Sequence, residues 1–215
     1  MALVIFDFDG VLADTLDDLI RFGQEACNQL GVNHFVTKDD LSHLEVMSFD
    51  TFGRACEVPE HLLDEFVKIS LNLFAEIESP PAIFDGLNEV IRYLSTNHKL
   101  AIVTTNTAQN VRAFLTHHGL DSLVHAVYGV DTPGSKAQKI SLARERFGEE
   151  SVFMIGDSLS DIRAAKEAGV TSIAVTWGHQ SLETLLRGEP DYLITSPDDL
   201  IEVIERRNGV SLGKR

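Results

Sequence analysis

Two aspartates one residue apart follow an apolar run at the start of the chain. Asp7 and Asp9 come directly after residues 2–6, and Gly10 follows them. Side chains alternate along a strand and a glycine lets the backbone turn, so one carboxylate can face a reacting centre while the other stands beside it as a proton donor. Like charges this close are costly without a cation or a proton between them. An ordinary strand followed by an Asp-Gly turn explains the same residues equally well.

A second apolar run, residues 152–155, leads into a loop that carries two more aspartates. Asp157 and Asp161 are four residues apart where this loop becomes a helix, a spacing that places both carboxylates on one side. Carboxylate oxygens at a strand end suit Mg²⁺, which binds one or two of them and keeps waters and substrate phosphate as further ligands. The helix macrodipole alone explains an acid at Asp161, but it leaves Asp157 unexplained.

Two further polar segments stand at the heads of predicted helices. Thr104, Thr105 and Asn106 follow the strand predicted for residues 100–103, and their hydroxyl, amide and backbone N–H groups can form a phosphate cradle. An N-cap role is the simpler explanation for Thr105 alone. A cation such as Lys136 opposes the macrodipole at a helix start. Pairing with a carboxylate and a phosphoryl oxygen would explain that position, and a solvated lysine is the alternative.

The elements that must position these residues alternate along most of the chain. After the first strand, hydrophobic periodicity predicts strands over 100–103, 126–128, 152–155, 171–175 and 192–194, and helices over 17–30, 87–95, 108–118, 137–147, 161–168, 182–186 and 197–207. This alternation indicates an α/β fold with a doubly wound, Rossmann-like parallel sheet covered on both faces. Ligands of such sheets bind at the carboxyl ends of the strands, where the polar segments lie.

One segment interrupts the alternation. Between residues 14 and 80 the sequence predicts helices and no convincing strand, and the Ser-Pro-Pro run at 79–81 ends the segment as a linker would. We therefore expect a Rossmann-like core formed by residues 1–13 and 81–215, with an inserted all-helical cap domain over residues 14–80. Closure of such a cap would exclude water and bring its side chains over a leaving group.

The candidate substrate contacts of this cap are Asp14, Thr15 and Arg54. Asp14 and Thr15 stand where the cap joins the core, and a helix N-terminus explains them equally well. Arg54 and Ser48 lie in a polar break between cap helices, where a solvated arginine is the simpler explanation. His179 lies beyond a strand end near the expected site, and we expect a surface histidine there.

Composition and charge favour a cytoplasmic protein. The 215 residues carry a formal net charge of −15, which argues against nucleic acid or an anionic membrane surface as partner. No apolar run approaches transmembrane length, and the first predicted strand begins too close to Met1 for a signal peptide. Cys27 and Cys56 lie in apolar helical stretches, so we expect small, reduced core residues.

Four motifs, taken together and in order, resemble the haloacid dehalogenase-like hydrolase superfamily, in particular its phosphatases with a small helical cap. They are Asp-x-Asp-Gly-Val from Asp7, the apolar strand that ends in Thr104, the lysine motif at Lys136, and Gly-Asp-x-x-x-Asp over residues 156–161. Each motif is weak alone, but together they span nearly the whole chain. The resemblance implies a Mg²⁺ cofactor and a small phosphorylated metabolite as substrate.

The resemblance also implies a role for each motif residue in phosphoryl transfer. Asp7 would be the nucleophile that forms an aspartyl-phosphate, and Asp9 the general acid and base. Lys136 would orient Asp7 and neutralise charge, and Thr104 would bind the transferring phosphoryl group. The full set of phosphate-binding candidates is Gly10, Thr104, Thr105, Asn106 and Lys136.

For the metal, the resemblance implies an acidic set of ligands. Asp7, the backbone carbonyl of Asp9 and the carboxylate of Asp157 would bind Mg²⁺, and Asp161 would complete the set directly or through water. An acid at Asp9 argues for phosphoryl transfer, because members that cleave carbon–halogen bonds lack it.

Within the superfamily, the segment Asp-Gly-Val-Leu-Ala-Asp-Thr over residues 9–15 resembles both phosphoglycolate phosphatases and β-phosphoglucomutases. The mutases carry a cap histidine five residues after the aspartate that matches Asp14, and this chain has Leu19 there. The favoured function is therefore a Mg²⁺-dependent phosphomonoester hydrolase with a phosphoglycolate-like substrate, as a monomer or homodimer. A β-phosphoglucomutase-like phosphotransferase and a non-enzymatic phosphoacceptor or binding relative are the alternatives.

Overall fold

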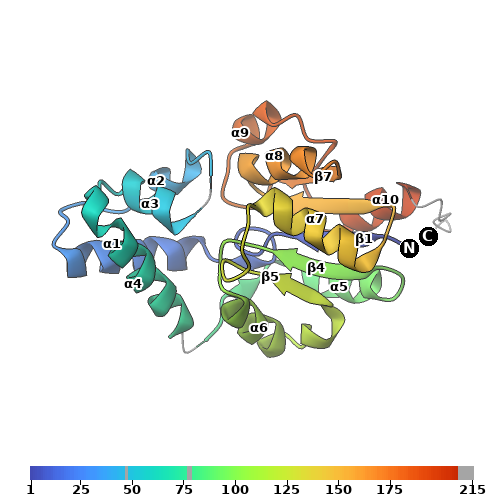
Figure 1. Ribbon diagram of the computed structural model, residues 1–215, viewed down its shortest axis with the longest axis horizontal. Coiled ribbons are helices and arrows are strands. Elements are labelled where there is room, and N and C mark those ends of the chain that lie inside the picture. Colours follow the sequence, from blue (N-terminus) through green and yellow to red (C-terminus); the bar gives the residue numbers. More distant parts are fainter. Residues whose placement is uncertain (47, 77–78, 208–215) are drawn as a thin grey trace.

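A single parallel sheet forms the centre of the protein in the computed structural model, which describes residues 1–46, 48–76 and 79–207. The strands run in the order β5-β4-β1-β6-β7-β8 (Figure 1). Their bounds are β1 Leu3–Phe6, β4 Lys99–Val103, β5 Ala126–Tyr128, β6 Val152–Gly156, β7 Thr171–Val175 and β8 Tyr192–Ile194. Phe6 at the end of β1 lies opposite Ile102 of β4 and Ile155 of β6. This topology confirms the predicted doubly wound α/β fold.

Helices cover both faces of the sheet, because alternate residues along the strands belong to two separate hydrophobic cores. The covering helices are α5 Leu87–Ser95, α6 Ala108–His117, α7 Lys136–Phe147, α8 Leu159–Glu167, α9 Leu182–Arg187 and α10 Asp198–Arg207, with a short 3₁₀ turn, η2, at Asp121–Leu123. Val4 and Phe6 of β1 belong to the core that contains α5 and α10. Leu3 and Ile5 face the core formed with α7 and α8. A strand that is buried on both faces has an unbroken run of apolar residues in its sequence, which is why β1 could be predicted.

A group of helices is inserted between two short strands next to the sheet. Strands β2 (Ala13–Asp14) and β3 (Ala82–Ile83) pair antiparallel. Between them lie α1 Leu16–Leu30, α2 Asp39–Ser42, α3 Phe49–Ala55, η1 Glu60–Leu62 and α4 Leu63–Ala75. Figure 1 shows these helices, here named the helical insertion, gathered to one side of the core. The β2–β3 pair was not predicted, because two-residue strands are too short to show an alternating pattern.

The predicted division into a core and a cap remains a prediction. Residues 47, 77–78 and 208–215, which fall within the predicted ranges, lie outside the part of the chain that the structure describes. Cys27 and Cys56 are both buried in the helical insertion as free thiols. Within the described residues, no helix is both long and apolar enough to cross a membrane.

Aromatic packing joins the sheet to the helical insertion. Phe8, which stands between the two aspartates at the end of β1, is fully buried. Its ring centroid lies 5.0 Å from that of Phe114 on α6 and 6.3 Å from that of Phe74 on α4. Phe74 in turn contacts Phe22 on α1 at 5.9 Å. These edge-to-face contacts fix the turn after β1 to the core on one side and the insertion on the other.

We expect Phe8→Ala to lower the free energy of unfolding by about 3–5 kcal/mol, because it leaves a cavity where three packed elements meet. Urea denaturation followed by circular dichroism measures this change. Phe8→Leu retains most of the buried volume and is the matched control, for which a smaller loss is expected. An alanine variant no less stable than the leucine variant would contradict the packing role of Phe8.

Candidate active site

Three buried carboxylates meet at the carboxyl ends of the two central strands. Asp7 directly follows β1, Asp157 directly follows β6, and Asp161 lies in the first turn of α8. Their side chains are at most 8% exposed. One carboxylate oxygen from each residue lies within 4.8 Å of the others. The pairing of β1 with β6 thus brings two sequence segments 150 residues apart into one acidic cluster.

Lys136 is the cation of this cluster. Its Nζ donates to Asp7 Oδ2 at 2.9 Å and to Asp161 Oδ1 at 2.5 Å. Lys136 is the first residue of α7, and a capping box between Ser135 and Gln138 sets the start of that helix. Burial acts to lower the pKa of Lys136, but Asp161 and Asp7 outweigh it and hold that pKa above its usual range. The ammonium group is therefore charged.

Asp161 caps the start of α8 with one carboxylate oxygen and binds Lys136 with the other. Its Oδ2 accepts hydrogen bonds from the backbone N–H of Ser158 at 3.1 Å and from the Ser158 hydroxyl at 2.6 Å, which completes the capping box of α8. Its Oδ1 binds Lys136. A Cβ atom at Gly156 would overlap Asp161, so the strand end can approach the helix this closely only with glycine there.

His179 is buried beside Asp157, so the expectation of a surface histidine was wrong. Its backbone N–H donates to Asp157 Oδ2 at 2.7 Å, and its ring Nδ1 lies 3.7 Å from the same oxygen. The segment after β7 folds back over the strand ends, and Trp177 Nε1 donates to the carbonyl of Val11 at 3.2 Å. Gly178 permits this approach, since a Cβ there would overlap Asp157. Two residues of this return segment, Gly178 and His179, thus form part of the site.

Asp9 faces away from the cluster toward the loop after β4. Its Oδ2 accepts from Asn106 Nδ2 at 3.3 Å, and its Oδ1 is buried without a hydrogen bond from the described residues. Asn106 is held by Thr107, whose backbone N–H donates to its Oδ1 at 2.9 Å. Burial raises the pKa of Asp9, against the opposing effects of His179 and Asn106. Asp9 thus lies apart from the lysine that binds Asp7, in a setting where its carboxyl group can hold a proton.

The two adjacent threonines occupy different places. The Thr104 side chain is buried and its Oγ1 accepts the backbone N–H of Asn106 at 3.0 Å, which leaves the hydroxyl proton for another acceptor. Thr105 lines a cavity next to Asp9. Gly10 has a positive φ of 77°, and a Cβ there would overlap Asp157, so its identity is set by backbone conformation and by space.

Lys139 supports the loop after β4 from behind and was not predicted. It is 7% exposed, and its Nζ donates to the carbonyl of Gly129 at 2.7 Å. Val130, the next residue, donates its backbone N–H to the carbonyl of Asn106 at 2.8 Å. Burial, and then the nearby Lys136, lower the pKa of Lys139. The only sequence signal for this residue is its spacing, one helical turn after Lys136.

The candidate contacts from the helical insertion are separated in space. Thr15 is fully buried, and its hydroxyl acts to lower the pKa of Asp9 without forming a hydrogen bond of good geometry to any described residue. Asp14 is exposed. Arg54 lies on the outer surface of α3, where it pairs with Asp50 at 3.1 Å and with both carboxylate oxygens of Glu60. Of the three, only Thr15 approaches the site.

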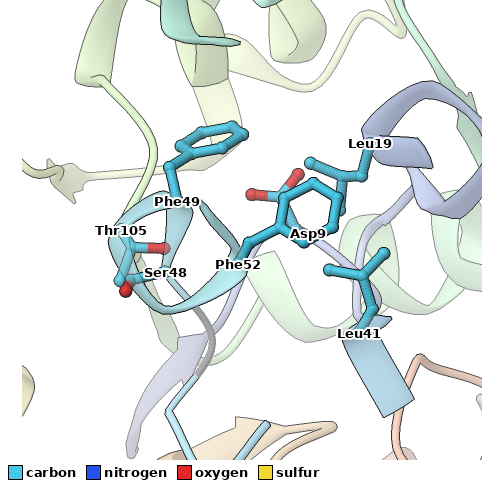
Figure 2. Close-up of a pocket in the computed structure, with 7 residues that line it drawn as sticks. All are labelled: Asp9, Leu19, Leu41, Ser48, Phe49, Phe52 and Thr105. Carbon is cyan, nitrogen blue, oxygen red and sulfur yellow. The ribbon is translucent and has the colours of Figure 1, made fainter. Parts of the chain in front are cut away.

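A cavity of about 40 Å³ lies between Asp9 and the helical insertion. Figure 2 shows the Asp9 carboxylate and the side chains that surround it. The lining residues are Asp9, Leu19, Leu41, Ser48, Phe49, Phe52 and Thr105. The wall is therefore formed jointly by the core and by three helices of the insertion, α1, α2 and α3 together with its N-cap.

One loop of the insertion is tied to the core. Glu45, between α2 and α3, pairs with Arg163 on α8 at 3.2 Å and with Arg187 at the end of α9 at 3.2 Å. Gln180 donates to the carbonyl of Leu44 at 2.5 Å and accepts from the backbone N–H of Leu159 at 2.7 Å. These contacts hold the insertion over the strand ends.

The acidic cluster fits a divalent cation. Three carboxylates are buried together with one ammonium group, which leaves an excess of negative charge. Burial raises the pKa of Asp7 well above its usual value, with Asp161 and Asp157 adding to the rise and Lys136 opposing it. Burial and Asp161 likewise raise the pKa of Asp157. Oxygen donors in this arrangement suit Mg²⁺, and the residues that could hold it are Asp7, Asp157 and Asp161.

The fold and the site together define a doubly wound α/β protein with an acidic, lysine-containing centre at the carboxyl ends of its strands. Residues 4–175 match the model of the haloacid dehalogenase-like hydrolase family, and the chain belongs to this family. The resemblance noted from the four sequence motifs is thereby confirmed, and the chain is an enzyme of the hydrolase class.

Similar proteins agree with this assignment over nearly the whole chain. The phosphoglycolate phosphatase of Synechococcus elongatus is 28% identical over 207 residues, which cover 95% of this chain and 97% of that protein. The phosphoglycolate phosphatase of Vibrio vulnificus is 26% identical over 217 residues, covering 94% and 95%. A haloacid dehalogenase-like hydrolase from Bacteroides fragilis has the same fold, with a TM-score of 0.83, 22% identity and coverage of 93% and 99%.

We expect Mg²⁺ to stabilise the protein more at pH 7.5 than at pH 5. Folding raises the pKa values of Asp7 and Asp157, so the metal-free protein loses stability as pH rises above about 4 and these buried groups ionise. Mg²⁺ binds the ionised form and offsets this loss. At ten times Kd, the melting temperature at pH 7.5 should rise by roughly 3–6 °C.

Thermal unfolding with and without MgCl₂ measures this effect, and Asp157→Asn is the matched control, since it keeps the shape and removes a charged ligand. The variant should show little or no Mg²⁺-dependent shift. Equal shifts at the two pH values, or a full shift in the variant, would contradict a metal site built on these carboxylates.

Proposed function

We propose that the protein is a Mg²⁺-dependent phosphomonoester hydrolase that works through an aspartyl-phosphate on Asp7. The observation that carries the proposal is the separation of two neighbouring carboxylates into two environments. Asp7 binds the charged Lys136 within the acidic cluster, whereas Asp9 stands at the wall of the cavity with one oxygen that accepts no hydrogen bond from the described residues. A nucleophile and a proton donor require such a difference.

In the first step, Asp7 attacks phosphorus in line with the ester oxygen, and Asp9 gives its proton to the leaving alkoxide. In the second step, Asp9 takes a proton from the water that hydrolyses the aspartyl-phosphate. Lys136 and the Thr104 hydroxyl offer positive charge and a hydrogen bond to the phosphoryl oxygens, where transition-state charge develops. A bound Mg²⁺ supplies further charge stabilisation at those oxygens. Asp7, Asp157 and Asp161 would hold it.

Phosphoglycolate is the first substrate to test, because relatives that match nearly the full chain bear the name phosphoglycolate phosphatase. A β-phosphoglucomutase-like transfer is less well supported. The position of the mutase histidine is occupied by Leu19, which offers the cavity only a hydrocarbon surface.

We extend the proposal to the domain organisation and the setting of the enzyme. Residues 14–80 act as a cap over the core formed by residues 1–13 and 81–215, and the β2–β3 pair joins the two parts. The contacts of Glu45 with α8 and α9 favour the closed arrangement. Two buried free thiols accord with a reducing compartment such as the cytoplasm.

We expect Asp7→Asn to abolish both phosphate release and phosphorylation of the protein. Asp9→Asn should slow hydrolysis of an alkyl phosphate by about 10²–10⁴-fold. With p-nitrophenyl phosphate, whose leaving group needs no proton, Asp9→Asn should instead accumulate phosphoenzyme, because only the second step still requires a base. Phosphate release and intact-protein mass spectrometry measure the two quantities. Turnover by Asp7→Asn at the wild-type rate would exclude Asp7 as the nucleophile.

Glu45→Gln should raise KM by about two- to fivefold with little change in kcat, because it removes both ion pairs that favour closure. The effect is modest because each exposed ion pair contributes little. Glu183→Gln on α9 removes an exposed acid close in sequence to Arg187 and serves as the matched control. Steady-state kinetics at low and high salt test this, because salt should raise the wild-type KM toward that of the variant. Identical salt dependence in both proteins would refute the closure role.

A further inference from the structure

The cavity beside Asp9 indicates which leaving groups the enzyme accepts, an inference that rests on the proposed function. Four apolar side chains form most of its wall: Leu19 from α1, Leu41 from α2, and Phe49 and Phe52 from α3 (Figure 2). Each of these residues is at most 9% exposed. The surface that faces a leaving group departing toward Asp9 is therefore hydrocarbon, contributed by three separate helices.

The polar groups of the cavity already have other roles. Asp9 is the proposed acid and base. The Ser48 hydroxyl accepts the backbone N–H of Thr51 at 3.2 Å and so caps α3. Thr105 follows Thr104 in the phosphate cradle. None of the described residues that line the cavity is a lysine, arginine or histidine.

The neighbouring basic side chains among the described residues do not line the cavity, and His179 lies beside Asp157, with its ring Nδ1 3.7 Å from Asp157 Oδ2. Arg54, on the same helix as Phe49 and Phe52, forms ion pairs with Asp50 and Glu60 on the outer surface. Lys136 is bound to Asp7 and Asp161.

A carboxylate on the leaving group would enter this cavity at a high cost. It would lose its hydration without gaining a cationic partner, and it would lie next to the negative charge that Asp9 acquires when it gives its proton to the alkoxide. An apolar group of the same shape meets neither obstacle and gains from contact with the four side chains. The volume of about 40 Å³ admits only a few non-hydrogen atoms.

We infer that the enzyme prefers phosphomonoesters of short apolar alcohols and discriminates against leaving alcohols that carry a carboxylate, glycolate included. In the reaction, the Asp7–phosphorus bond forms as the ester P–O bond breaks, and the proton of Asp9 passes to the alkoxide. Water then breaks the Asp7–phosphorus bond and returns a proton to Asp9. The products are the apolar alcohol and inorganic phosphate.

Isobutyl phosphate and phosphoglycolate form a matched substrate pair, because an isopropyl group replaces the carboxylate at similar size on the same CH₂–O–P linkage. The expected result is a kcat/KM at least about tenfold higher for isobutyl phosphate, since a hydrophobic pocket separates substrates by factors of about 10–200. Both are measured by phosphate release with saturating Mg²⁺, and activity in the Asp7→Asn variant is subtracted.

Phe49→Lys tests the origin of the preference. Phe49 is the first residue of α3 and the most exposed of the four wall residues, at 9%, so a lysine there can place its ammonium group in the cavity. The ratio of the two kcat/KM values should shift toward phosphoglycolate by at least about tenfold. Phe49→Leu is the apolar control and should keep the wild-type preference.

The outcomes separate this inference from the function on which it rests. Equal or better hydrolysis of phosphoglycolate by the wild-type enzyme overturns the inference and leaves the phosphatase proposal intact. Absence of Asp7-dependent hydrolysis of both esters and of p-nitrophenyl phosphate overturns both. The wild-type ratio decides the question by itself if Phe49→Lys does not fold, as judged by circular dichroism.

Discussion

The burial of three carboxylates around one ammonium group is the constraint on which the rest of the structure depends. Lys136 binds Asp7 and Asp161, an oxygen of Asp157 lies within 4.8 Å of theirs, and all three carboxylates are nearly excluded from water. Such an arrangement is unfavourable unless the surrounding fold holds it in place. The rigid supports are visible: paired central strands end at Asp7 and Asp157, and capping boxes fix the starts of α7 and α8. The excess negative charge that remains is what makes a divalent cation fit.

The same constraint explains how two neighbouring aspartates acquire different properties. Phe8 stands between them and is fully buried against Phe114 and Phe74. With Phe8 fixed on the core side, the turn after β1 directs Asp7 to the cluster and Asp9 to Asn106. The difference between a lysine-bound carboxylate and one with an oxygen that accepts no hydrogen bond from the described residues thus arises from packing as much as from electrostatics.

Much of this arrangement could be predicted from the sequence, because its signals are local. Unbroken apolar runs marked the buried strands, and polar residues at their ends marked the carboxyl edge of a parallel sheet. The burial of His179, the role of Lys139 and the β2–β3 pair could not be found in the same way. His179 is buried only because the segment after β7 folds back over the site, and Lys139 is fixed by a carbonyl ten residues away in the chain. Such contacts depend on tertiary structure, which no short pattern records.

Similarity to other proteins supports conclusions about the cluster around Asp7 more strongly than conclusions about the cavity wall. The cluster around Asp7 contains the motif residues by which the chain resembles the family, so the proposed chemistry rests on those motifs. The cavity wall comes from Leu19, Leu41, Phe49 and Phe52, on helices of the insertion that carry none of those motifs. Relatives that are 26–28% identical can keep the first and change the second. The leaving group must therefore be argued from the cavity of this chain, and that cavity offers a carboxylate no cationic partner among the residues described.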